Sequence, residues 1–127
     1  MTEELQKKLQ SEIEEYKQVQ KEYQKLCSRR QQLDSQLSEN TIVDEELKLM
    51  KTGNEIYKLV GPILIKQDPI EAKENVKKRL EFINSDIKRT EEAISSIEKK
   101  QEVHRNKLEA LQVQFQKAQM MMAQKAK

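Results

Sequence analysis

The sequence predicts a mainly α protein, in which a short β-hairpin joins the two arms of a long antiparallel two-helix coiled coil. Two observations predict this fold. Apolar residues recur at heptad spacing on both sides of the middle of the chain, as they do in coiled coils. The middle itself contains every glycine and proline of the chain, namely Gly53, Gly61, Pro62 and Pro69. Around them the apolar pattern changes to short β-branched runs, which are typical of strands.

The composition is that of long helices rather than of a globular domain. Of the 127 residues, 36% are charged and 4% are aromatic, so little apolar surface is available for a compact core. The single cysteine, Cys27, excludes a framework of disulfides and indicates a reducing compartment. The N-terminus lacks the apolar core of a signal peptide, and no apolar run approaches the roughly 20 residues that span a membrane. We therefore expect a soluble, cytoplasmic protein with no membrane partner.

Charge is distributed unevenly along the chain. Residues 1–47 carry seven Lys and Arg and eleven Asp and Glu, whereas residues 70–127 carry thirteen and nine. An acidic first arm and a basic second arm attract each other, which favours a chain that folds back on itself. Acidic residues interleave with the basic ones of the second arm, so a nucleic-acid partner is not expected.

The first arm, residues 1–50, is predicted to be helical with one apolar seam. With Leu9 at heptad position a, the a positions are Leu9, Tyr16, Tyr23, Arg30 and Leu37. The d positions are Leu5, Glu12, Val19, Leu26, Leu33, Asn40 and Leu47. The polar run at residues 38–41 favours a break or kink near residue 40, with Thr41 capping a new short helix that ends near Met50.

Residues 54–67 are predicted to form the hairpin, with strands at Ile56–Val60 and Ile63–Gln67 on either side of a turn at Gly61-Pro62. Both faces of the first strand are apolar except at Lys58, which implies burial on both faces. An isolated hairpin is marginal in water, and its unpaired edges invite other strands. Burial of its large apolar side chains involves on the order of 10 kcal/mol. We therefore expect assembly with other chains; the alternative is that the hairpin folds back on its own helices.

The second arm, residues 69–127, has a sequence typical of a helix start. Asp68 is a suitable N-cap, and Pro69 fits the first helical position. The a positions are Leu80, Ile87, Ile94, Gln101, Leu108, Phe115 and Met122. The d positions are Val76, Ile83, Thr90, Ile97, His104, Leu111 and Ala118.

We expect the two seams to pair in an antiparallel register in which facing residue numbers sum to about 120. Leu9 then lies opposite Leu111. The same register groups the polar exceptions, so that they satisfy each other. The expected polar pairs are Arg30 with Thr90 and Tyr16 with His104.

This register places Met120, Met121 and Met122 past the start of the first arm, near Leu5, Leu9 and Phe115. Methionine side chains adapt their shape to varied apolar partners. We expect either an exposed apolar binding surface here or a frayed C-terminal segment with no role.

No arrangement of residues indicates catalysis or a bound metal. His104 is the only histidine, and no Cys, Asp or Glu cluster at ligand spacing surrounds it in the sequence, so we expect it to occupy a polar layer of the seam. Cys27 is expected to be a half-buried thiol, because His104 lies several helical turns away in the proposed register. The sequence has no Gly-rich phosphate loop and no nucleophile elbow. We predict no enzymatic activity, no metal and no cofactor.

The middle of the chain carries a more specific pattern than the heptads. In order, it contains Glu39-Asn40, Val43 and Glu46-Leu47, then Tyr57-Lys58-Leu59-Val60-Gly61-Pro62-Ile63-Leu64-Ile65, then Ala72, Val76 and Arg79-Leu80. With these residues, a single hairpin and long flanking helices, the sequence resembles the β-class subunits of prefoldin. The resemblance covers nearly the whole chain, as one domain of residues 1–127.

The resemblance implies a heterohexamer of α-class and β-class prefoldin subunits, whose hairpins build an intersubunit β-barrel platform. The tips of the coiled coils would hold unfolded proteins such as actin and tubulin and pass them to the cytosolic chaperonin without ATP. The implied assembly residues are Ile56, Tyr57, Leu59, Val60, Ile63, Leu64 and Ile65. The implied client-binding residues are Leu5, Leu9, Phe115, Met120, Met121 and Met122.

Two other interpretations are considered for the same helices. An RNA-binding helical arm would bind with an affinity that falls steeply with salt. A coiled-coil scaffold would pair its helices end to end with those of other chains. Neither alternative explains an apolar hairpin at the bend between the arms.

Overall fold

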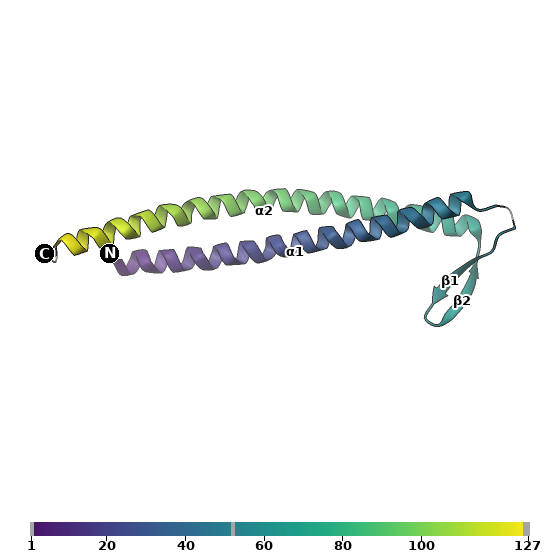
Figure 1. Ribbon diagram of the computed structural model, residues 1–127, viewed down its shortest axis with the longest axis horizontal. Coiled ribbons are helices and arrows are strands. Elements are labelled where there is room, and N and C mark those ends of the chain that lie inside the picture. The colour runs from purple at the N-terminus through teal and green to yellow at the C-terminus, as the bar shows by residue number, and fades with distance from the viewer. Residues whose placement is uncertain (1, 52, 126–127) are drawn as a thin grey trace. The chain divides into compact units, whose positions relative to one another are not determined.

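The computed structural model describes residues 2–51 and 53–125. In chain order, its elements are α1 (Thr2–Leu49), β1 (Ile56–Val60), β2 (Ile63–Gln67) and α2 (Pro69–Lys125) (Figure 1). The described residues form two compact units. We call the first the terminal unit; it contains the described residues up to Ser28 and from Glu92 onward. The second is the hairpin unit, which contains residues Arg29–Glu91. The expected architecture of two long helices separated by a short antiparallel hairpin is confirmed.

In the terminal unit, α1 and α2 run antiparallel, because Glu12 of α1 contacts His104 of α2 while Tyr23 lies near Glu98. Every a and d position predicted from Leu5 to Leu26 and from Ile94 to Ala118 is buried or half-buried. The heptad seam is therefore confirmed here. Because each helix has one neighbour, most seam side chains of this unit are half-buried rather than fully enclosed.

In the hairpin unit, residues at the predicted a and d heptad positions of both helices also form the interior. Leu33 is the most buried large side chain, with 1% of its surface exposed. A cluster of Leu47, Ala72 and Val76 lies farther along the helices. Met50, Ile56 and Leu80 pack against this cluster, and Ile56 belongs to β1. The hairpin is thus fixed to the helices at one end by an apolar contact.

The new helix predicted to begin at Thr41 is absent, because α1 continues from Thr2 to Leu49 without interruption. The polar side chains in this stretch bond within their own helix. Asn40 Nδ2 donates to the carbonyl of Gln36 at 2.7 Å, and Thr41 Oγ1 donates to the carbonyl of Leu37 at 2.6 Å. These bonds to the preceding turn need an intact helix, whereas an N-cap bonds forward to the following turn. The helix prediction at Thr41 was therefore wrong.

The hairpin matches its prediction in both strands and in the turn. β1 and β2 pair in antiparallel register from Ile56 with Gln67 to Val60 with Ile63. Gly61 and Pro62 form the two-residue connection, and Gly61 has a φ of 58°. A positive φ at the first central position is what a type II′ hairpin turn requires, and glycine adopts it without a steric penalty.

The start of α2 also matches its prediction. Asp68 Oδ1 accepts a hydrogen bond from the backbone N–H of Ile70 at 3.3 Å, and the Asp68 carbonyl accepts one from Ala72 at 2.9 Å. Pro69 is the first helical residue, where its missing N–H removes no helical bond. These contacts satisfy groups that a helix start leaves unbonded.

The polar layers differ in detail from those expected. Arg30 Nη2 lies 2.9 Å from Glu91 Oε1, while the Thr90 hydroxyl donates to the carbonyl of Asp86 in its own helix. In the terminal unit, His104 contacts Glu12 rather than Tyr16. The observed partners lie within one helical turn of the predicted ones, so the proposed register holds to that precision within each unit.

Among the helices of residues 2–51 and 53–125, none combines the length and apolar content that crossing a membrane requires.

Replacing Leu33 by alanine should destabilise the isolated chain by about 2–5 kcal/mol, because it removes a fully buried side chain and leaves a cavity. Leu49→Ala is the matched control, since Leu49 is 82% exposed and its truncation should change stability by about 0.5 kcal/mol or less. Denaturant unfolding followed by circular dichroism measures both. Equal effects at the two positions would contradict the placement of the seam.

Candidate assembly and client-binding surfaces

The hairpin presents an unusual amount of exposed apolar surface. Six of the seven residues predicted for assembly are between 49% and 68% exposed, namely Tyr57, Leu59, Val60, Ile63, Leu64 and Ile65. The seventh, Ile56, is half-buried against the cluster in the hairpin unit. In the single chain, the hairpin therefore packs on its own helices mainly at the end near Ile56, and its other apolar side chains stay about half or more exposed.

Both faces of the hairpin are apolar. Directly paired residues share a face, and side chains alternate along each strand. Leu59 and Leu64 pair on one face, whereas Val60 and Ile63 pair on the other. The sheet has only these two strands, so each strand also has one edge whose backbone groups are not paired within the sheet. The hairpin thus offers two apolar faces and two strand edges to other molecules.

A polar contact orders the end of the hairpin near the helices. Tyr57 Oη donates a hydrogen bond to Glu55, and Lys66 Nζ lies 3.5 Å from the other carboxylate oxygen. Tyr57 and Lys66 are a cross-strand pair on one face, so Glu55 holds both strands at this position. The hydrogen bond to the Glu55 carboxylate raises the pKa of Tyr57 above its ordinary value. The same hydrogen bond fixes the position of the Tyr57 hydroxyl at this end of the hairpin.

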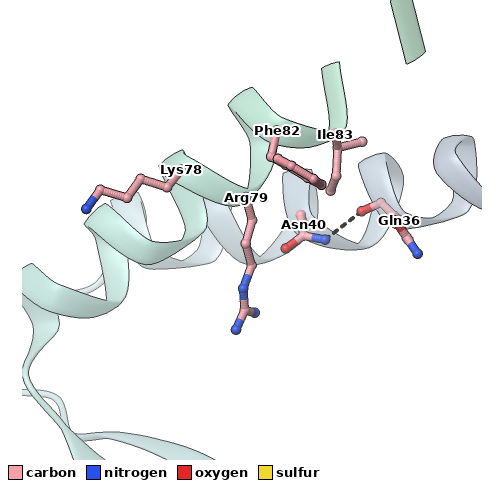
Figure 2. Close-up of a pocket in the computed structure, with 6 residues that line it drawn as sticks. All are labelled: Gln36, Asn40, Lys78, Arg79, Phe82 and Ile83. Carbon is pink, nitrogen blue, oxygen red and sulfur yellow. Dashed lines mark hydrogen bonds between the residues drawn. The ribbon is translucent and has the colours of Figure 1, made fainter. Parts of the chain in front are cut away.

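The helices of the hairpin unit add a groove that the sequence reasoning missed. It has a volume of about 520 Å³ and is lined by Gln36, Asn40, Lys78, Arg79, Phe82 and Ile83. Figure 2 shows Phe82 and Ile83 of α2 facing Asn40 and Gln36 of α1, whereas Lys78 and Arg79 extend away. Phe82 is 64% exposed. The sequence could have indicated this groove, because Phe82 is a large aromatic residue at a heptad position other than a or d.

Other exposed apolar residues lie in the same unit. They are Ile42, Val43 and Leu49 on α1 and Ile70 on α2. None belongs to the seam series predicted from the heptads. The exposed apolar surface of the hairpin unit therefore includes helix residues as well as the hairpin.

In the terminal unit, the methionines have the exposure expected of them. Met120, Met121 and Met122 are between 58% and 66% exposed on α2. The other predicted client-binding residues, Leu5, Leu9 and Phe115, are half-buried seam residues. The unit also exposes Val103 and Val113, which the sequence reasoning missed because it followed only the seam positions.

His104 lies in a polar layer of the seam, as expected, and the packing adds an acidic cluster that the residues near it in the sequence do not show. Glu12 and Glu15, one turn apart on α1, both lie beside the His104 ring. Local spacing around His104 could not reveal them, because they are about ninety residues away in the sequence and only the antiparallel packing brings them close.

Cys27 is half-buried, as expected. It lies beside Tyr23 on the preceding turn of α1. The pKa of Tyr23 is raised above its ordinary value. The largest cause is the hydrogen bond with Cys27, and the electrostatic effects of Cys27 and Glu98 add to it. This contact places the thiol within a local polar network of the seam.

Comparison with known proteins gives one consistent result. A family model described as prefoldin subunit matches residues 10–115. The chain is 48% identical over 119 residues to prefoldin subunit 6 of Mus musculus, covering 94% of each chain. It is 37% identical over 123 residues to prefoldin subunit 6 of Arabidopsis thaliana, covering 97% of this chain and 93% of the relative. These matches agree with the resemblance to prefoldin that the residues in the middle of the chain indicated.

Among solved structures, the chain resembles the prefoldin beta subunit from Thermococcus strain KS-1. The TM-score is 0.54 at 21% identity, and the match covers 87% of this chain and 91% of the other. This likeness shows a common fold of long helices and hairpin.

Proposed function

The chain belongs to the prefoldin subunit family and is a prefoldin chaperone subunit, and from this premise we propose that it assembles with α-class and β-class subunits into a cytoplasmic hexamer. In this proposal residues 1–127 act as a single β-type domain. The hexamer captures unfolded proteins, such as actin and tubulin, at the tips of its coiled coils. It passes them to a cytosolic chaperonin and uses no ATP.

The exposed hairpin is the observation that carries the assembly proposal. Full burial of a large aliphatic or aromatic side chain contributes roughly 1.5–3 kcal/mol. The six exposed hairpin residues therefore involve on the order of 10 kcal/mol, which is comparable to the stability of a whole domain. A surface of this kind favours a permanent partner over exposure to water.

The partners proposed for the hairpin are the hairpins of neighbouring subunits. Strand edges pair readily with other strands, and a closed barrel leaves no edge unpaired. Two apolar faces suit a position between the interior of such a barrel and an adjoining layer. The proposed assembly residues are Ile56, Tyr57, Leu59, Val60, Ile63, Leu64 and Ile65.

The groove at Phe82 supports a wider interface on the same unit. Phe82 and Ile70 are both more than 60% exposed on α2, and Leu49 is exposed on α1. We assign these side chains to contacts with the helices of a neighbouring subunit, because an assembled hairpin brings the neighbour's helices close to this unit.

Leu64→Asp should prevent assembly, because it places a charge on an apolar face of the hairpin that becomes buried in the proposed barrel. Val113→Asp is the matched control, since Val113 is an exposed apolar residue of the terminal unit. Each variant is co-expressed with α-class and β-class subunits, and native mass spectrometry measures the complexes. We expect hexamers with the wild type and the control, and unassembled chain with Leu64→Asp.

Circular dichroism should show unchanged helix content in the Leu64→Asp chain, because Leu64 makes no contact with the helical interior. Two results would contradict the assembly proposal. One is a full yield of hexamer with Leu64→Asp. The other is a wild-type chain that stays monomeric with every partner.

The client-binding proposal rests on the exposed methionines. Thioether side chains are flexible and polarizable, so they adapt to apolar segments of different shape. Met120, Met121 and Met122 provide such a surface, and the half-buried Leu5, Leu9 and Phe115 lie in the adjoining seam. An unfolded chain offers many apolar segments of no fixed geometry, which is the kind of partner that this surface accommodates.

Changing Met120, Met121 and Met122 together to serine should weaken client capture several-fold, because the substitution removes the adaptable apolar surface. The measurement is light scattering from unfolded actin diluted into solutions of the assembled complex. Val103→Ser with Val113→Ser is the control, since both valines are exposed on the same helix outside the cluster. Hexamer mass should be unchanged in all variants. Undiminished suppression of aggregation by the triple variant would place the client site elsewhere.

A further inference from the structure

We propose that Glu12, Glu15 and His104 form a binding site for a first-row divalent cation, with Zn²⁺ as the best-fitting ion. His104 Nδ1 contacts Glu12 Oε1 and lies 3.8 Å from Glu15 Oε2. One ligand atom from each residue lies within 4.8 Å of the other two. All three residues belong to the terminal unit, and the site requires neither assembly nor client binding.

The separation of the donor atoms suits a small cation. Zinc binds imidazole nitrogen and carboxylate oxygen at about 2.0–2.2 Å, so two ligands of a tetrahedral ion lie roughly 3.4 Å apart. The Glu15–His104 distance is close to that value. The ion would replace the proton shared by His104 Nδ1 and Glu12 Oε1, which would be released to solvent, and these two atoms would move apart to about 3.4 Å. Three protein ligands leave one position for water or another exchangeable ligand.

The helices bring the three ligands together by ordinary geometry. Glu12 and Glu15 are three residues apart on α1 and therefore share a face of that helix. His104 faces them from α2, which runs antiparallel in this unit. Metal sites inside helix bundles commonly use carboxylate and histidine side chains from facing helices in this way.

Charge and burial favour a cation at this position. The side chains of Glu12 and His104 are each 12% exposed, whereas that of Glu15 is 59% exposed. Within residues 2–51 and 53–125, His104 is the only basic side chain within ion-pair distance of either carboxylate. Neither carboxylate therefore has a lysine or arginine partner among those residues. A divalent ion would neutralise both and would add a coordinate bond to the ring.

The site is accessible from solvent. A groove of about 390 Å³ is lined by Glu15, Gln18, Val19, Glu22, Lys100 and His104. Glu15 and His104 belong both to this groove and to the ligand set, so an ion has a path to the donors. Lys100 lines the same groove and is the feature that opposes cation entry. It forms no ion pair with Glu12 or Glu15 among the described residues.

The donor set limits the kind of ion. One imidazole and two carboxylates suit Zn²⁺, Co²⁺ or Ni²⁺, whereas Mg²⁺ and Ca²⁺ prefer ligands that are all oxygen. A bound ion would bridge α1 and α2 at a layer of the seam that contains polar side chains. It would therefore link the two helices at this polar layer.

The test uses the full chain, stripped of metal with a chelator and titrated with Zn²⁺ in a calorimeter. We expect saturable binding of one ion per chain and a higher melting temperature in the presence of Zn²⁺. Co²⁺ should give the visible absorption of a tetrahedral site with nitrogen and oxygen ligands. Absence of saturable binding to the wild-type chain would overturn the proposal.

Variants separate this site from other zinc-binding groups. Glu15→Gln and His104→Gln should each weaken Zn²⁺ binding at least tenfold. Glu15 is largely exposed, so its variant should fold normally even if His104→Gln loses helix content. Glu14→Gln and Cys27→Ser are the controls, since Glu14 is an exposed glutamate outside the ligand set and Cys27 is the one thiol of the chain. Undiminished binding by Glu15→Gln, or binding lost in Cys27→Ser, would contradict the assignment.

Discussion

Each long helix of this chain has one apolar stripe, and the two stripes pack against each other. This pairing uses the seam residues of both helices, from Leu33 and Leu47 on α1 to Val76 and Ile97 on α2. Of the hairpin, Ile56 alone packs into the buried cluster, while its other apolar side chains are about half or more exposed. The seam thus buries its own residues and leaves the hairpin largely uncovered, and the need for partner chains follows from the exposed hairpin. Assembly and client capture are then proposed for different units of the same chain.

Much of the fold follows from local sequence patterns. The heptad positions identify the buried seam, because an antiparallel pair of helices can bury only one stripe of each. Gly61 and Pro62 locate the turn between the strands, since a tight hairpin needs a residue that accepts a positive φ. Asp68 locates the start of α2 through its capping oxygen. In each of these three cases, only a few residue types can satisfy the local geometry, and one of those residue types is present at the position in question.

The polar contacts were harder to predict, because a polar side chain has several possible hydrogen-bond or ion-pair partners and only the folded structure shows which one it contacts. Thr41 could cap a new helix or bond to the preceding turn, and an uninterrupted α1 favours the second. The acidic groups around His104 come from Glu12 and Glu15 on the other helix, so they become visible only when the packing is known to within one turn. Phe82 lies outside the seam, and a periodicity argument gives no role to such a residue. Client binding is harder still to predict, because an adaptable methionine surface specifies no single partner.

The hairpin is proposed to be unprotected in the single chain and to become buried by β-pairing with other subunits. This proposal can be tested by hydrogen exchange of the backbone amides of residues 56–67, measured in the isolated chain and after mixing with α-class and β-class prefoldin subunits. We expect rapid exchange in the isolated chain and slowing by at least about a hundredfold in the complex, because new interstrand hydrogen bonds would form and water would be excluded. Amides of the seam in the terminal unit should change little. Strong protection of the hairpin in the isolated chain, or no slowing on mixing, would contradict the account.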